Sequence, residues 1–108
     1  MILAASQDYR PSRLVFLVAL VLGVVAACAG IPLQEISDAR QAVSAAREVG
    51  AEAHAPIHFE RAETLLGRAE RALESGDYDK ARGEATLAKE EAVRARERAL
   101  QSQQDRQP

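Results

Sequence analysis

The sequence predicts an all-α fold: a small antiparallel three-helix bundle with alanine-rich seams, which follows a cleaved signal peptide. Three observations predict this class. After residue 32, apolar residues recur at steps of three and four, as on one face of a helix, and no stretch alternates as a half-buried strand does. Proline interrupts none of these periodic stretches. Alanine fills most inward positions, and small contact residues let helices pack closely.

The first element is a short apolar leader. Arg10 and Arg13 precede a run of fourteen uncharged residues, 14–27, which is the layout of a secretory signal. Crossing a bilayer core takes about 20 apolar residues, so this run is short for a permanent span. We therefore expect residues 1–27 to be a signal peptide. An uncleaved anchor remains the alternative, because extending the run through Ile31 gives about eighteen residues.

The remaining chain is divided by residues typical of helix ends. Gly50 suits the position after a helix, Pro56 suits a first helical turn, and Asp77 suits an N-cap. The connection around Asp77 is short enough to make the helices on either side antiparallel. In chain order we expect a tether at 28–32, helices at 33–49, 56–75 and 78–103, and a disordered tail at 104–108.

One face of each helix should form the core. The inward positions expected from the spacing are Ile36, Ala39, Val43, Ala46, Gly50, Phe59, Ala62, Leu66, Ala69, Leu73, Tyr78, Ala81, Ala85, Ala88, Ala92, Ala95 and Ala99. At about 1.5 Å per residue the third helix would be roughly 38 Å long, against about 30 Å for the second. Its last two turns should therefore project beyond its neighbours.

Charge and motifs exclude several classes of function. Residues 28–108 hold twelve Lys and Arg against fifteen Asp and Glu, a net charge of −3, and nucleic-acid binding normally needs a basic face. We find no nucleophile elbow, phosphate loop or dinucleotide fingerprint, so we expect no catalytic residues and no enzyme. His54 and His58 share a helical ligand spacing, yet only Glu52 or Glu60 is near as a third ligand. Solvent-exposed histidines between helices explain the pair better than zinc.

Asp77 and Asp79 resemble the opening of a calcium loop, but Arg82 occupies the position that needs glycine. Helix capping is the simpler interpretation of Asp77. We expect no metal site and no cofactor.

The leader ends on Val25, Ala26, Ala27 and Cys28, and Cys28 is the only cysteine. This sequence resembles the lipobox of bacterial lipoproteins. The resemblance implies that the Cys28 thiol takes a diacylglyceryl group, that cleavage occurs before it, and that its new amino group is acylated with a chain such as palmitate. The following residue is Ala29 rather than an inner-membrane-retaining Asp, so the resemblance implies the outer membrane, facing the periplasm. The alternative is an unmodified cysteine in a hydrophobic run.

The helical part also resembles a family, the small OmpA-associated domain of unknown function 4398. The resemblance runs from Pro32 to Leu100. Its matching segments are Ile36–Ala42, Gly50–Glu52 with Ala55-Pro56, Ala62-Glu63 with Leu65-Leu66, then Ala69 and Ala72, and Gly76–Asp79 with Ala81-Arg82 and Ala85. The resemblance implies an envelope lipoprotein, with an OmpA-like or other envelope protein as partner. It carries over no catalytic residue.

The charged side of the third helix offers a candidate partner face at Glu90, Arg94 and Arg98. Solvated pairing of Glu90 with Arg94, four residues apart, is the alternative explanation. The tether between Cys28 and Leu33 spans at most roughly 18 Å, which would hold the bundle at the membrane. We expect a structural or adaptor lipoprotein, with self-association also open; the alternative is a small binding module for a cell-wall or lipid ligand.

Overall fold

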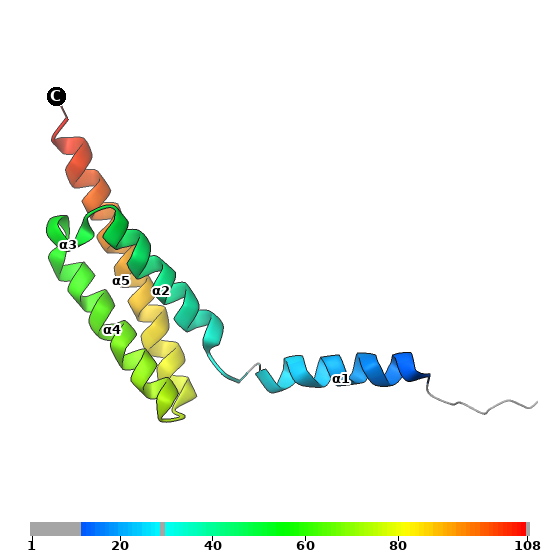
Figure 1. Ribbon diagram of the computed structural model, residues 1–108. Helices are drawn as coiled ribbons and strands as arrows, with labels where there is room; N and C mark the ends of the chain where they lie inside the picture. Colours follow the sequence, from blue (N-terminus) through cyan, green and yellow to red (C-terminus); the bar gives the residue numbers. More distant parts are fainter. Residues whose placement is uncertain (1–11, 29, 108) are drawn as a thin grey trace, which may run out of the picture. The chain divides into compact units, whose positions relative to one another are not determined.

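The computed structural model describes residues 12–28 and 30–107, and all regular structure in that part is helical. The predicted all-α class is confirmed. In chain order the helices are α1 (Arg13–Cys28), α2 (Leu33–Glu48), α3 (Ala51–His54), α4 (Pro56–Glu74) and α5 (Tyr78–Asp105), as labelled in Figure 1. The sequence did not predict α3, a single turn of helix inside the expected connection between α2 and α4.

The chain divides into two compact units, Met1–Gly30 and Ile31–Pro108. The first contains α1, whose apolar side chains from Leu14 to Leu22 are exposed. The 16 residues of α1 correspond to about 24 Å of helix. Among the residues described, no helix combines the length and the apolar character needed to span a bilayer.

A glycine in the left-handed region ends α4. Gly76 has φ of +80° and donates its N–H to the carbonyl of Leu73, while the N–H of Asp77 reaches the carbonyl of Ala72. This pair of bonds is a Schellman motif, which satisfies carbonyls that have no partner at a helix end. The same turn starts the next helix, because the side chain of Asp77 accepts a hydrogen bond from the N–H of Lys80.

A second left-handed glycine, Gly50, ends α2 and begins α3. Its φ is +78°, its N–H bonds to Arg47, and its carbonyl accepts from the N–H groups of Ala53 and His54. Ala55 then leaves the helical region, with φ of −145° and ψ of +56°, and Pro56 opens α4. The conformation of the connection between α2 and α4 is therefore set by local backbone hydrogen bonds and by the preferences of Gly50 and Pro56.

In the second unit, α2 and α4 both pack along α5 (Figure 1). The contact face of α5 consists of six alanines that are fully buried, Ala81, Ala85, Ala88, Ala92, Ala95 and Ala99. Around this seam the buried residues form two clusters. One surrounds Phe59 near α3, and the other surrounds Ile36 near the α4–α5 turn, with Leu66 packed against both. The small alanines of α5 therefore pack with two larger buried side chains, Phe59 near α3 and Ile36 near the α4–α5 turn.

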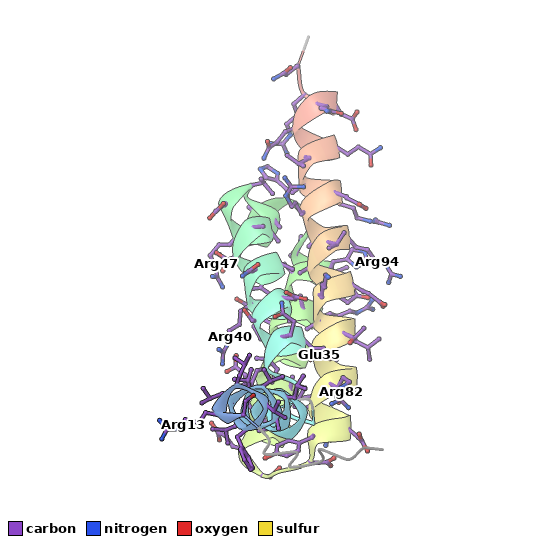
Figure 2. The ribbon with its side chains drawn as sticks, turned by 90° about the vertical axis from the view of Figure 1, so that its right-hand side faces the viewer. Arg13, Glu35, Arg40, Arg47, Arg82 and Arg94 are labelled. Carbon is purple, nitrogen blue, oxygen red and sulfur yellow. The ribbon has the colours of Figure 1, made fainter. Side chains whose placement is uncertain are left out.

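Salt bridges link the outer edges of the helices. Arg47 of α2 contacts Glu63 of α4 at 2.7 Å, and Arg40 contacts Glu70 at 3.1 Å. These arginines are labelled in Figure 2, together with Glu35 and Arg82, which join α2 to α5 at 3.4 Å. All are substantially exposed, so each contributes at most about 1 kcal/mol.

The last turns of α5 extend past α3, as Figure 1 shows. Near this end, Nε2 of Gln103 donates a hydrogen bond to the carbonyl of Val49 at 2.7 Å, which links α5 to the residue after α2. The helix continues to Asp105 rather than ending near residue 103.

Some expected core positions differ in the structure. Tyr78 was predicted to be buried, but it is 40% exposed, and that prediction is wrong. As the first residue of α5 it lies beside the turn rather than between helices. Leu66 and Leu73 are half-buried at the edge of the core, and Ala72 is buried where the spacing did not predict it.

Candidate functional site

The most enclosed ion pair among the described residues links α4 to α5. Nδ1 of His58 lies 2.7 Å from Oε2 of Glu91, and the two side chains are only 18% and 14% exposed. The other oxygen of Glu91 accepts from Arg94 at 3.1 Å. Both carboxylate oxygens are therefore engaged. The expectation that His58 lies between helices is met, but the expectation that it is solvent-exposed is wrong, because α4 turns this residue toward α5.

Electrostatics favour the charged form of Glu91. The hydrogen bond from His58 lowers the pKa of Glu91 below its ordinary value of 4.5, and the positive charges of His58, Arg94 and Arg61 act in the same direction. Burial opposes them but is outweighed. The side chain is thus an ionised carboxylate at neutral pH, held between two helices.

A hollow of about 250 Å³ lies next to this pair, where α3 meets α4 and α5. It is lined by His54, Ala55, Pro56, Ile57, His58, Arg61 and Arg98. A second, shallower hollow of about 440 Å³ continues along α4 from Ile57 and Arg61 to Arg68. Shared lining residues make the two hollows neighbours on one surface.

The structure separates the three residues of the predicted partner face. Arg94 forms its ion pair with Glu91 rather than with Glu90. Glu90 and Arg94 line a hollow on the outer side of α5, together with Val93. Arg98 instead lines the hollow shared with α4. Arg94 and Arg98 are four residues apart, and on a helix residues at this spacing are neighbours, so the two hollows adjoin along α5, with Glu90 and Arg94 lining the outer one and Arg98 the one shared with α4.

The lipidation site falls mostly outside the described part of the chain. The backbone of Val25, Ala26, Ala27 and Cys28 forms the last turn of α1, but the side chains of these residues lie outside the described part, as does Ala29 altogether. The predictions for the lipobox and for the lipid on Cys28 therefore stay predictions.

The histidines do not assemble a metal site. Within the described residues, no group of three His, Cys, Asp or Glu side chains is placed to hold a metal ion. His54 ends α3 and His58 belongs to α4, with the non-helical residue Ala55 between them. The break in the helix disrupts the spacing that suggested a common ligand face.

Sequence reasoning missed the pairing of His58 with Glu91. One signal was available, since Glu84, Glu91 and Arg98 are spaced by seven residues along the edge of the alanine seam. Positions that flank a seam contact the partner helix. His58 lies one residue before the buried Phe59, which places it at the matching edge of α4.

Residues 34–108 match the protein family described as "Domain of unknown function (DUF4398)". The chain belongs to this family. The DUF4398 match begins at the second residue of α2 and covers the rest of α2 through α5, so it contains both the His58–Glu91 pair and the hollows along α4. No curated protein and no solved structure matched the chain. The predicted family is confirmed, while its link to lipoproteins and to OmpA stays a prediction.

Proposed function

We propose that this protein is a lipid-anchored envelope protein whose DUF4398 domain is a structural or adaptor module. It acts through protein–protein contacts at the periplasmic face of the outer membrane. The scaffold of this module is a three-helix bundle of α2, α4 and α5, in which α3 is part of the connection.

The observation that carries the proposal is the position of Cys28. This residue ends α1, and the compact helical unit begins only at Ile31. Cleavage before Cys28 would remove the leader without cutting into the helical unit. The cysteine is preceded by Val25, Ala26 and Ala27, which resemble a lipobox.

Lipid on Cys28 would supply the anchor that α1 is too short to provide by itself. Each buried methylene contributes about 0.8 kcal/mol, and a single chain binds only marginally, so several chains on one residue give stable attachment. The tether from Cys28 to Leu33 reaches roughly 18 Å at most, which keeps the adaptor close to the membrane. An OmpA-like or other envelope protein at that surface is the partner class we propose.

The anchor is tested by mass spectrometry of protein purified from envelopes. We expect a mature chain that begins at Cys28 and carries lipid, and a Cys28→Ser variant that keeps its leader and incorporates no palmitate. Ala29→Asp is the matched control, expected to remain lipidated but to fractionate with the inner membrane. Native protein that retains residues 1–27, or that has an unmodified thiol at residue 28, would refute the proposal.

The adaptor role is tested with a photo-crosslinker placed at Arg98 or at Glu90 in the anchored protein. We expect protein adducts from at least one of these positions. Adducts with lipid or cell-wall polymer alone would instead support the small binding module. The two functions therefore give different products in one experiment.

A further inference from the structure

A basic surface runs along α4, on the side formed by the two neighbouring hollows. We call it the α4 basic surface and define it as Ile57, Arg61, Leu65, Arg68 and Arg98. Apolar and cationic residues alternate along α4 in this set. Ile57 is 65% exposed, which makes it one of the most exposed large apolar side chains of the helical unit.

The arginines of this surface differ from those on the α2 side. Arg40 and Arg47 are engaged by Glu70 and Glu63. Within the described part of the chain, Arg61, Arg68 and Arg98 form no salt bridge. Their guanidinium groups therefore retain donors for carboxylates, which they bind in a planar, two-point geometry.

The charge of the surface opposes that of the rest of the unit. Three arginines and one acidic residue, Glu60, line the two hollows, whereas residues 28–108 as a whole carry a net charge of −3. The nearby carboxylate of Glu91 is already engaged by His58 and Arg94. A local excess of positive charge on an acidic domain favours an acidic partner.

The shape of the surface favours a helix as that partner. Ile57, Arg61 and Arg68 are separated by four and seven residues, so they form one stripe about 16 Å long on α4. A helix lying along such a stripe presents side chains at the same intervals. Its apolar residues would contact Ile57 and Leu65, and its carboxylates would reach Arg61, Arg68 and Arg98.

We propose that the α4 basic surface docks an acidic amphipathic helix of another protein. This proposal deepens the adaptor function and rests on it, but it does not depend on the lipid anchor. An intact lipid on Cys28 combined with no helix binding would reject the docking surface alone. Loss of the lipid would reject the anchor alone.

The test uses the full chain in non-ionic detergent and a fluorescent 18-residue peptide with leucine on one face and glutamate beside it. A peptide with lysine in place of every glutamate is the control probe. We expect fluorescence anisotropy to show binding of the glutamate peptide only. The double variant Arg61→Glu/Arg68→Glu should bind at least tenfold more weakly, with affinity falling as salt rises.

A matched variant, Arg96→Glu/Arg106→Glu, makes the same change in net charge at two exposed positions, one on α5 and one directly after its end, and should bind within twofold of the native chain. Ile57→Ser changes no charge and should weaken binding at least threefold, which keeps the test valid if the double variant is destabilised. Circular dichroism checks that each variant is folded.

Several results would overturn the proposal. One is equal binding of the lysine peptide, and another is no binding of the glutamate peptide at millimolar concentration. A third is amide-exchange protection of residues 57–68 by vesicles containing phosphatidylglycerol but not by neutral vesicles, without peptide binding, which would assign the surface to anionic lipid. A dimer that Arg61→Glu/Arg68→Glu dissociates, again without peptide binding, would assign it to a second copy of the chain.

Discussion

At the scale of single residues, the contact of His58 with Glu91 is the least exposed ion pair in the described part of the chain, so we expect it to stabilise the fold more than the others do. Exposed ion pairs such as Arg40 with Glu70 contribute little, because water screens them. Glu91 is mostly buried and has partners at both oxygens. Removing a partner from a shielded carboxylate costs more than removing one from an exposed pair.

This pair predicts a dependence of stability on pH. The folded protein lowers the pKa of Glu91. The ionised Glu91 carboxylate therefore makes its full contribution to stability when the pH is above the ordinary pKa of 4.5, and this contribution is lost as the pH falls through the lowered pKa. We expect Glu91→Gln to reduce the free energy of unfolding by about 1 kcal/mol at pH 7 and by less at pH 3. Urea denaturation at both pH values measures the difference.

Glu90→Gln is the matched control, since Glu90 is the neighbouring residue, is exposed, and carries the same charge. It should change stability little at either pH. An equal loss for Glu91→Gln at pH 7 and pH 3 would show that the ionised carboxylate is not the source of the stabilisation.

At the scale of elements, Gly76 and Gly83 have opposite effects on stability. Gly76 needs its positive φ to end α4, whereas Gly83 lies inside α5, and a Cβ at either position meets nothing within 4 Å. Backbone conformation alone therefore separates them. Gly76→Ala should destabilise the protein by about 1 kcal/mol, because alanine disfavours the left-handed region.

Gly83→Ala should stabilise the protein by roughly 0.5–1 kcal/mol, because alanine is the better helix former. Thermal unfolding of the two variants gives the comparison, and the melting temperatures should move in opposite directions. Destabilisation by both substitutions would show that packing, rather than backbone preference, controls Gly83.

The alanine seam of α5 predicts that a larger side chain is harmful there. Ala88 is fully buried and its neighbour Leu87 is 50% exposed. We expect Ala88→Leu to cost about 1–3 kcal/mol through overpacking. Leu87→Ala should cost less than about 1 kcal/mol, since a residue that is half in water has little burial to lose. Chemical denaturation of both variants tests whether close approach of the helices requires alanine.

At the scale of the whole molecule, the division after Gly30 predicts that the helical unit folds without the leader. A chain of residues 28–108 should keep its helical circular dichroism and unfold cooperatively. Its melting temperature should lie within about 4 °C of the full chain, a shift that corresponds to roughly 1 kcal/mol for a domain of this size. A non-cooperative transition would mean that α1 contributes to the core.

The sequence by itself determined the helical class, the family and the alanine seam of α5. Those features depend on local chemistry: a period of three and four residues, and glycine, proline and aspartate at helix ends. Each of the six alanines expected on the inward face of α5 is fully buried. The period alone could place them because a helix repeats its geometry from turn to turn.

Only the tertiary structure decided which edges of the helices meet. It paired His58 with Glu91, moved Arg98 onto the surface shared with α4, and left Tyr78 exposed beside a turn. A periodic pattern defines the face that a helix buries, but not the rotation and axial offset at which a neighbour packs against it. Those two quantities depend on contacts between residues far apart in the chain, and they determine where the surfaces available to a partner lie.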